Sequence, residues 1–483
     1  MKRWLLLLLV GCSSPPPPPP TVRVVILHTN DIHGQAYARK DRDTQQMVGG
    51  LAAVAHYIRK TRAAERAKGA RVLVVDCGDF FQGTPEGNLT IGKLIVDYFN
   101  AVGYDVLCVG NHDFDFGPAV TRMLAERARF PFIAANVHLK GSRDPPPWLA
   151  TSVSFDDLKL EFLGLLTSDM PNVTMERARV GLDFEREEDA LKRLGWCEKG
   201  DRARVLLTHV GIERERQLIA AAKIDALCGG HSHTAVAENI GATAYVQSGS
   251  KTSHVGRVDL VLQDGRVLEA KSSLHVPLVS EGEDADIAAI IKKYAVEIDK
   301  VMDEVVGELA VDLPQGKGPV SSPLGNYMCD CMRDATGAEI AIHNRAGIRS
   351  SLSKGVVKRR DAFQVSPFGN TLYTMKLKGS ALTELFETAL KEDRHFLEVS
   401  GMEVIHDNRA IVSINVGGKA LDRDRAYTVV TNSFLAPGGD GHTVFLGGTD
   451  RKDTGIDMME AHIADLRKQK PRKFEFVERV RMK

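Results

Sequence analysis

The feature that most constrains the fold is a unit that recurs five times: a short apolar run, rich in β-branched residues, that ends abruptly in polar residues able to bind metals. Near-continuous apolar runs are typical of strands buried on both faces. Helix-like stretches lie between some of them, at residues 50–68 and 92–102. Strands that alternate with helices predict a layered α/β domain whose ligands gather at the carboxyl ends of the strands. The five runs are residues 22–27, 72–75, 106–109, 205–207 and 226–228.

The polar residues that follow these runs share a metal-binding chemistry. Imidazole and carboxylate groups together favour zinc, manganese or iron over calcium or magnesium alone. Any single histidine here could be structural, but the whole constellation indicates a metal site. It is too large for one ion, whereas two ions bridged by a shared carboxylate, about 3.5–4 Å apart, would use most of it. The set is Asp31, His33, Asp79, Asn111, His112, His209, His231 and His233.

Two pairs within this set, Asp31 with His33 and His231 with His233, are each separated by one residue. In an extended segment such residues point to the same side. We therefore expect both members of each pair to face the site. Glycines flank these residues and permit tight turns and close approach to a ligand.

The order of these motifs resembles that of calcineurin-like metallophosphoesterases. The Asp113-Phe114-Asp115 continuation and the later part of the chain are similar to the 5′-nucleotidase family, which includes periplasmic UDP-sugar hydrolases and ecto-5′-nucleotidases. The resemblance extends from about Val22 to the C-terminus. It implies an α/β fold, with a four-layer α/β/β/α metallophosphoesterase sandwich and a second α/β substrate-binding domain joined to it by a helix. The motifs are Asp31-Ile32-His33, Gly78-Asp79, Gly110-Asn111-His112-Asp113-Phe114-Asp115, His209 and Gly230-His231-Ser232-His233.

The resemblance also implies two divalent metal ions as cofactors, zinc, manganese or similar. In part of the family the position of His233 is a glutamine, so a histidine there is a permitted variant. Asp79 would bridge the two ions. One ion would be held by Asp31, His33, Asp79 and His233, and the other by Asp79, Asn111, His209 and His231.

The remaining histidine of the set, His112, is not needed as a ligand because the other seven residues suffice. By resemblance it contacts the phosphate or the leaving group and is held by Asp115, three residues later, as an Asp–His dyad. For Asp113, which lies between them, we expect a solvated acid of the loop.

A helical pattern separates the two halves of the chain. Between residues 284 and 305, apolar residues recur at helical spacing with charges on the other face, which predicts an amphipathic helix. Its ordinary role is core packing, and the resemblance adds the role of an inter-domain connector; both can hold. We expect a metallophosphoesterase domain at residues 21–280, the connecting helix at 281–306 and a nucleotide-binding domain at 307–483.

Three motifs of the second domain resemble the substrate-binding segments of 5′-nucleotidases. Residues 344–349 are similar to the N-x-G-G-I-R turn of that family, 366–370 to its P-F-x-N segment, and 432–441 to its N-F-L-A-x-G-G-D-G loop. The resemblance implies two aromatic rings that clamp a base, with polar contacts to the rest of the substrate. Without the family, each phenylalanine is more often a core residue, and the aspartate a turn residue. The residues carried over are Asn344, Arg349, Phe368, Asn370, Phe434 and Asp440.

One departure from the family concerns phosphate anchoring. The family commonly has an arginine several residues before the Gly-Asn pair found here at Gly325-Asn326, but this chain has none, and Lys317 is the nearest cation. Lysine acts as a point charge and cannot reproduce the bidentate fork of arginine. Ala346 also replaces a usual glycine. We therefore expect weaker phosphate anchoring or a different preferred substrate.

The N-terminal residues 1–20 read as a lipoprotein signal peptide and a proline-rich tether. Two basic residues and the apolar run 4–10 lead to Leu9-Val10-Gly11-Cys12, which resembles the bacterial lipobox, whose cysteine is acylated. Six prolines follow and favour polyproline II, a spacer of roughly 19 Å. We expect an exported, membrane-anchored lipoprotein in the periplasm or at the cell surface. The alternative is an ordinary signal peptide with an incidental cysteine at residue 12.

Charge and cysteine content narrow the possible partners. The 63 basic and 63 acidic residues balance, which argues against a dedicated binder of nucleic-acid polymers. No protein partner is evident. Cys77, Cys108 and Cys228 end apolar runs and are expected to be buried thiols, and nothing in the spacing of the cysteines supports disulfides.

The function expected from the resemblance is that of an exported dimetal phosphohydrolase, a 5′-nucleotidase that converts nucleoside phosphates to nucleoside and phosphate. Enzymes with the same metals and another substrate are the first alternatives: a nucleotide-sugar or 2′,3′-cyclic nucleotide phosphodiesterase, or a thiosulfohydrolase-like relative. An alternative of another class is a tethered nucleoside receptor without catalysis. The presence of every expected candidate ligand argues against that last alternative.

Overall fold

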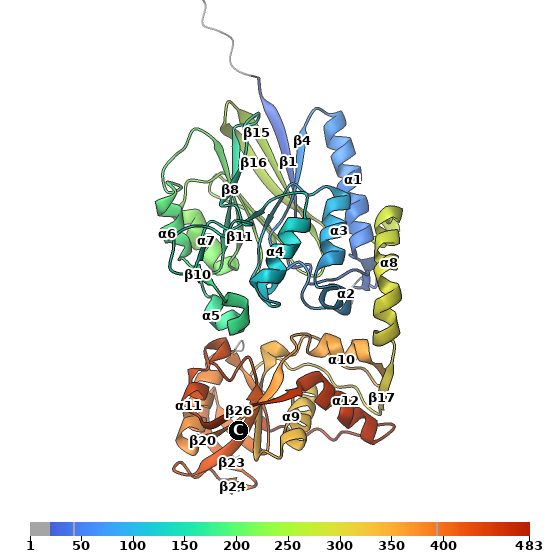
Figure 1. Cartoon of the computed structure of the whole chain (residues 1–483), viewed down its shortest axis with the longest axis vertical. Helices are drawn as coiled ribbons and strands as arrows, with labels where there is room; N and C mark the ends of the chain where they lie inside the picture. Colours follow the sequence, from blue (N-terminus) through green and yellow to red (C-terminus); the bar gives the residue numbers. More distant parts are fainter. Residues whose placement is uncertain (1–19, 42–43, 393–394) are drawn as a thin grey trace, which may run out of the picture.

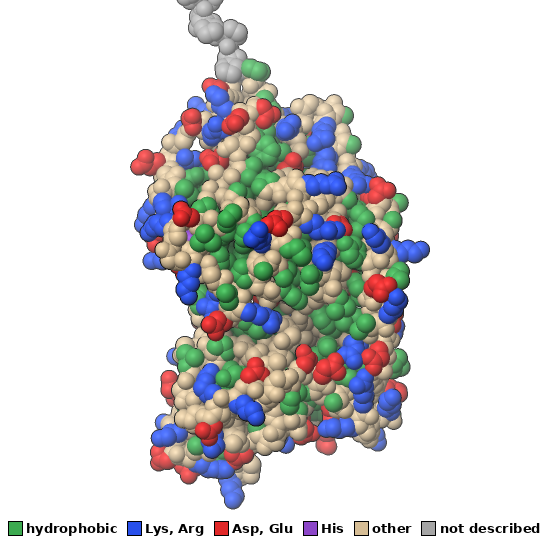
Figure 2. Space-filling model, in the orientation of Figure 1, with side chains coloured by type: hydrophobic (Ala, Val, Ile, Leu, Met, Phe, Trp, Pro, Cys, Tyr) green, Lys and Arg blue, Asp and Glu red, His purple; other side chains and the backbone are tan. Residues whose placement is uncertain are grey.

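The computed structural model describes residues 20–41, 44–392 and 395–483. The predicted signal sequence, the predicted lipidation site Cys12 and all but the last residue of the proline spacer lie outside the described residues. Figure 1 shows two bodies stacked along the long axis, linked along one side by helix α8 (Ala285–Met302). On the surface drawn in Figure 2, basic and acidic side chains are interspersed over both bodies.

The first body contains two six-stranded sheets. The first has the order β16-β15-β1-β4-β5-β6 and the second β13-β14-β12-β11-β9-β8. Within each, four neighbouring strands are parallel, and the remaining strands pair antiparallel at the edges. The strands are β1 (Val22–Thr29), β4 (Arg71–Asp76), β5 (Val106–Cys108), β6 (Phe132–Ile133), β15 (Val255–Gln263), β16 (Arg266–His275), β8 (Ser152–Phe155), β9 (Leu160–Leu166), β11 (Ala203–His209), β12 (Ala226–Gly229), β13 (Ala235–Ile240) and β14 (Thr243–Ser248).

The two sheets pack face to face, and helices cover their outer faces. In β1, Val24 and Ile26 point into the core between the sheets, whereas Val25 and Leu27 point into the core under the helices. This alternation explains why residues 24–27 are all apolar, and it confirms the predicted four-layer α/β/β/α sandwich. The helices are α1 (Leu51–Ala67), α3 (Lys93–Val102) and α4 (Pro118–Arg127) on the first sheet, and α6 (Glu187–Arg193) and α7 (Ile212–Ala221) on the second.

Shorter elements complete the first body. The two-stranded sheets are β2 (Arg39–Lys40) with β3 (Met47–Val48), and β7 (Val137–Leu139) with β10 (Leu182–Phe184). The short helices are α2 (Pro85–Leu89) and α5 (Met170–Val173).

Helix α8 is amphipathic, as the spacing of its apolar residues predicts. Asp284 caps its first turn, because the carboxylate accepts hydrogen bonds from two backbone N–H groups there. Ile287 and Ile291 pack into the core of the first body. Near the other end, Asp299 forms an ion pair with Arg360 of the second body. The helix therefore packs against one body and is tied by charge to the other.

The second body is also α/β. Its main sheet has the order β21-β18-β25-β20-β26, beside a smaller sheet β24-β23-β22-β27 and the pair β17-β19. The strands are β17 (Val305–Leu309), β18 (Ile340–Asn344), β19 (Gly355–Lys358), β20 (Thr371–Lys378), β21 (Leu397–Ser400), β22 (Met402–Asp407), β23 (Ala410–Val416), β24 (Lys419–Ala420), β25 (Ala426–Asn432), β26 (Thr449–Asp457) and β27 (Val480–Met482). The helices are α9 (Pro323–Thr336), α10 (Arg359–Val365), α11 (Gly379–Ala389) and α12 (Met458–Lys468).

The remaining features of the fold are the state of its cysteines and the character of its helices. Cys77, Cys108 and Cys228 are free thiols buried between the two sheets of the first body, as predicted. Within the described part of the chain, none of the helices combines the length and the apolar character needed to cross a bilayer.

Candidate active site

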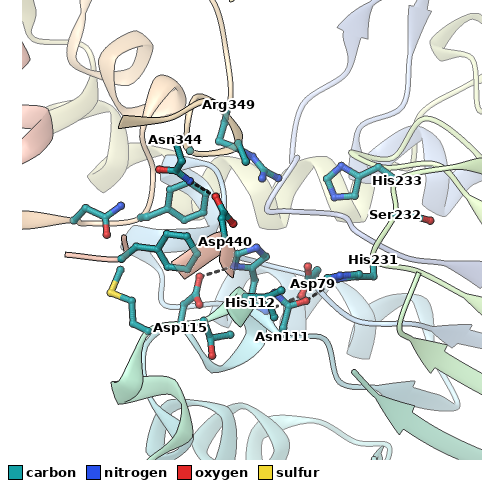
Figure 3. A pocket seen from close by; sticks show the side chains of 18 residues that line it. Asp79, Asn111, His112, Asp115, His231, Ser232, His233, Asn344, Arg349 and Asp440 are labelled. Carbon is teal, nitrogen blue, oxygen red and sulfur yellow. Dashed lines mark hydrogen bonds and ion pairs between the residues drawn. The ribbon is translucent and has the colours of Figure 1, made fainter. Parts of the chain in front are cut away.

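The polar residues predicted at the strand ends come together where the first body faces the second, and Figure 3 labels Asp79, Asn111, His112, His231 and His233 of this set. Asp31 follows β1, Asp79 follows β4 and Asn111 follows β5, while His209 ends β11 and His231 follows β12. Because the parallel strands of both sheets end at the same edge of the sandwich, residues far apart in sequence meet there.

One group of potential metal ligands contains Asp31, His33 and His233. The Nε2 atoms of the two histidines lie 3.0 Å apart, and the Asp31 Oδ1 atom lies 3.3 Å from Nε2 of His233. The Nδ1 atom of His33 is 2.7 Å from the carbonyl oxygen of Gln82 and donates to it. The Nε2 atom of His33 therefore carries the lone pair of the ring, which is free to bind a metal ion beside Asp31 and His233.

A second group contains Asp79, His209 and His231. The Nε2 atom of His209 lies 3.1 Å from Asp79 Oδ2, and its Nδ1 atom donates to the carbonyl oxygen of Cys77 at 2.6 Å. Asn111 Oδ1 lies 2.9 Å from Nδ1 of His231. Asp79 Oδ2 is also 3.8 Å from Nε2 of a residue of the first group, His33, so the Asp79 carboxylate stands between the two groups.

The donor set fits two divalent cations. Asp31 Oδ1 and His209 Nε2 are buried side-chain atoms without a hydrogen-bond partner among the described residues. Burial by itself would raise the pKa of Asp31 and of Asp79. The neighbouring histidines have the larger, opposite effect and hold both pKa values below the usual range. The same carboxylates raise the pKa of buried His209. The site therefore attracts positive charge, which a proton or a metal ion can supply.

The backbone at these residues differs from the extended geometry expected from the sequence. Asp31, His33, Asp79, His231 and His233 all have left-handed φ angles, between 48° and 79°. Such conformations cost non-glycine residues about 1–3 kcal/mol each and persist where the surrounding structure imposes them. Each pair still faces the site, but through tight turns of the backbone, not through the alternation of a strand.

The expectation for Asp113 is wrong. The side chain is fully buried and accepts hydrogen bonds from the backbone N–H groups of Asp79 at 3.0 Å, Phe80 at 3.0 Å and Gly110 at 2.7 Å. A carboxylate can satisfy several backbone donors that would otherwise be buried without partners. Asp113 therefore ties the loop after β4 to the loop after β5, and it fixes the position of Asp79.

His112 and Asp115 form the predicted dyad. His112 lies in a single turn of 3₁₀ helix, η1 (His112–Phe114), and its Nδ1 atom is 2.7 Å from Asp115 Oδ2. Burial disfavours the charged imidazole, yet the nearby carboxylates of Asp115 and Asp79 raise the pKa of His112. Its ring centroid lies 5.7 Å from that of His33 and 5.8 Å from that of Phe368. His112 thus stands between the metal-binding groups and the second body.

The residues predicted in the second domain line the same cavity, of about 340 Å³, as those of the first. Phe368 and Phe434 are both half-buried, so neither is a fully buried core residue. Asp440 has a φ of 53° and accepts a hydrogen bond from Asn344 Nδ2 at 2.7 Å. From the second domain the lining includes Asn344, Arg349, Phe368, Asn370, Phe434 and Asp440, and from the first it includes Asp79, Asn111, His112, Asp115, His231 and His233.

Among the described residues of the second domain, Arg349 is the cation that lines this cavity. Its guanidinium carbon lies 5.6 Å from the ring centroid of Phe368, and the carboxylates of Asp79, Asp31, Asp115 and Asp440 act on it electrostatically. Lys317, the nearest cation to the position of the missing arginine, is exposed and is not part of the lining.

The sequence did not reveal one wall of the cavity. Val173, Thr174 and Met175, from the segment around α5, also line it. Two residues further on, the Nε atom of Arg177 donates to the carbonyl oxygen of Asp115 at 2.8 Å, and its guanidinium also approaches the carbonyl oxygen of Phe368 at 3.4 Å. No motif marks this segment, so only the fold could place it at the site.

Comparisons with known proteins find one matching family for each of the two bodies. Residues 24–235 match the family described as calcineurin-like phosphoesterase, and residues 305–447 match the one described as 5′-nucleotidase, C-terminal domain. The trifunctional nucleotide phosphoesterase protein YfkN of Bacillus subtilis is 28% identical over 92% of this chain and 34% of its own length. The chain spans 34% and 37% of the lengths of the first two curated relatives it matches.

Two further relatives are covered over most of their length. The snake venom 5′-nucleotidase of Crotalus adamanteus is 27% identical, over 89% of this chain and 84% of that protein. The crystal structure of a 5′-nucleotidase precursor from Thermus thermophilus superposes with a TM-score of 0.82 at 26% identity, and covers 95% of this chain and 99% of that one. The likeness therefore includes both bodies and their connection.

Proposed function

Because the chain belongs to the 5′-nucleotidase family of metal-dependent phosphoester hydrolases, we propose that it hydrolyses nucleoside phosphates to nucleoside and phosphate. One observation supports this proposal above all others. A single cavity is lined by members of the metal-binding groups of one domain and by an arginine, two aromatic rings and polar side chains of the other. A nucleotide needs both kinds of surface, one for its phosphate and one for its nucleoside.

In this proposal Asp31, His33, Asp79 and His233 hold one divalent ion, and Asp79, Asn111, His209 and His231 hold the other. Ions bound there supply the Lewis acidity that activates water near neutral pH and offsets the charge of the phosphoryl oxygens.

The side chains of the protein account for the other parts of the reaction. Asp115 accepts a hydrogen bond from Nδ1–H of His112, which orients the charged imidazole so that Nε2–H can donate its proton to the leaving oxygen. Arg349 adds positive charge for the phosphate, beside the ring of Phe368. Phe368 and Phe434 clamp the base, while Asn344, Asn370 and Asp440 offer polar groups to the rest of the nucleoside.

A panel of substrates tests the proposal. Phosphate release from AMP, ADP and UDP-glucose, with and without added Mn²⁺ or Zn²⁺, should be fastest with a nucleoside phosphate and should depend on the metal. A 2′,3′-cyclic nucleotide, a nucleotide sugar or a thiosulfonate as the preferred substrate would favour one of the related hydrolases. Tight binding of nucleosides with no turnover of any ester would favour a receptor.

The aromatic clamp predicts a substrate-specific loss. Replacing Phe368 or Phe434 by Ala should weaken binding of AMP by about 1–3 kcal/mol, because each ring stacks on the base. Hydrolysis of p-nitrophenyl phosphate, which has no base, should change little. Phe445 of the same domain is fully buried and serves as the matched control. Phe445→Ala should cost about 3–5 kcal/mol of stability and reduce activity on both substrates alike. If the clamp variants behave like this control, both rings are core residues.

We also propose that the protein is exported and anchored through a lipid on Cys12, which is supported by the junction Leu9-Val10-Gly11-Cys12 and the prolines that follow. Cys12→Ser should block acylation and release the protein from membranes, as a soluble species or an uncleaved precursor. Mass spectrometry of the native protein should find a lipidated N-terminal cysteine. An unmodified N-terminus that begins beyond residue 12 would contradict the anchor.

A further inference from the structure

Glu215 is a fully buried acid between helix α7 and the second sheet of the first domain. Its neighbours along the buried face of α7, Leu218 and Ile219, belong to an apolar cluster that also contains Tyr245. None of the ion pairs formed by the described residues includes Glu215. A buried carboxylate costs several kcal/mol unless its surroundings compensate it.

The compensation comes from four hydrogen-bond donors. Oε1 accepts from Thr208 Oγ1 and from the backbone N–H of Gly230, both at 3.1 Å. Oε2 accepts from the Tyr245 hydroxyl at 2.6 Å and from Gln247 Nε2. An ionised carboxylate has about four acceptor positions, so these donors fill it. Burial raises the pKa of Glu215 to about 7 against the opposing effect of these hydrogen bonds, so the carboxylate form prevails above that pH.

Two of the four donors adjoin potential metal ligands. Thr208 precedes His209, and Gly230 precedes His231. Gln247 strengthens the second connection, because its Oε1 atom accepts from Ser232 Oγ at 2.9 Å on the other side of His231. The contact is close: a Cβ atom added to Gly229 would lie 2.2 Å from Oε1 of Glu215.

We propose that Glu215 is a positioning residue for the second metal ion, and that it sets the places of His209 and His231 through Thr208 and Gly230. The proposal rests on the assignment of the second metal group in the proposed function. Glu215 lies beneath the loops and is not part of the cavity lining. It acts through the histidines and does not contact the substrate. Each oxygen of Glu215 accepts from two donors, so the NH₂ group of a glutamine at this position would face two donors and could accept from neither.

A pair of matched variants tests the proposal, because each removes one hydrogen bond to Glu215. Thr208→Val removes the bond beside His209, whereas Tyr245→Phe removes a bond from a residue that adjoins neither histidine in sequence. Metal-free protein is titrated with Mn²⁺ by calorimetry at pH 8. Thr208→Val and Glu215→Gln should weaken one of two Mn²⁺ sites by about 10–100-fold, the usual effect of losing a group that orients a ligand. Tyr245→Phe should leave both sites near the wild-type affinity.

A second measurement identifies the weakened site. His231→Ala should lose the same Mn²⁺ site, and adding Glu215→Gln to it should leave the affinity of the remaining ion unchanged. Equal weakening of both sites, or equal effects of Thr208→Val and Tyr245→Phe, would show that Glu215 only stabilises the fold. A wild-type protein that binds fewer than two Mn²⁺ ions would also overturn the proposal. Binding of two ions without hydrolysis of any nucleotide would refute the proposed function and leave this inference intact.

Discussion

Asp79→Asn should abolish turnover, with a fall in rate on the order of 10³-fold or more. Asparagine keeps the shape of the side chain and one oxygen but loses the negative charge. Asp79 Oδ2 lies 3.1 Å from Nε2 of His209 in one group and 3.8 Å from Nε2 of His33 in the other. Both of the proposed ions would therefore depend on this carboxylate, and elemental analysis of the variant should find that metal content has fallen together with phosphate release.

A buried acid three residues earlier provides the control. Burial raises the pKa of Asp76 to about 8, so this residue is mostly neutral at pH 7, and Asp76→Asn changes little charge. Asp76 accepts hydrogen bonds from Thr29 Oγ1 and from the backbone N–H of Gly78, and it belongs to neither metal group. Asp76→Asn should retain both ions. Two tightly held ions in Asp79→Asn would refute the bridging role.

The sequence could predict the layers and the converging loops because both follow from local patterns. The stretch 24–27 is apolar throughout because the strand is buried there on two faces, and the parallel strands must end at one edge of the sandwich. The residue types that follow them limit the chemistry to metals bound by imidazole and carboxylate groups. The substrate-binding residues of the second domain were predicted only from the family resemblance. A phenylalanine such as Phe368 or Phe434 carries no chemical feature that marks it as a binding residue.

The remaining features depend on contacts that only the folded chain creates. Asp113 reads as a loop acid, and its role appears only when three backbone N–H groups from two loops surround it. Glu215 stands in the charged stretch Glu213-Arg214-Glu215-Arg216 and reads as a surface residue of a helix, although it is fully buried. The left-handed backbone of Asp31 and Asp79 likewise depends on the loops around them, since aspartate adopts this conformation more often than most residues but does not require it.

The contact between the domains shows the same limit. Arg177 is an exposed arginine without a motif, yet it donates to the carbonyl oxygen of Asp115 in its own domain and approaches that of Phe368 in the other. Asn88 Nδ2 also donates across the same boundary, to the carbonyl oxygen of Pro367 at 2.8 Å. Backbone carbonyls accept both bonds, so no pattern of side chains could have indicated them.

His112→Asn should lower the maximal rate of AMP hydrolysis by about 10²–10⁴-fold, the usual contribution of general acid catalysis. Metal content should not change, because the side chain of His112 belongs to neither metal group. The backbone N–H of residue 112, which donates to Asp79 Oδ1 at 2.8 Å, survives the substitution. Asp115→Asn should act in the same direction, because it removes the acceptor that orients Nδ1.

Two substrates distinguish the roles open to His112. If Nε2 gives a proton to the leaving oxygen, the loss should be large with AMP, whose alkoxide is a poor leaving group. It should be much smaller with p-nitrophenyl phosphate, whose phenolate leaves without a proton. If His112 instead holds a phosphoryl oxygen, both substrates should lose rate equally, since they share that group. Loss of metal from His112→Asn in elemental analysis would contradict both roles and would make His112 a ligand.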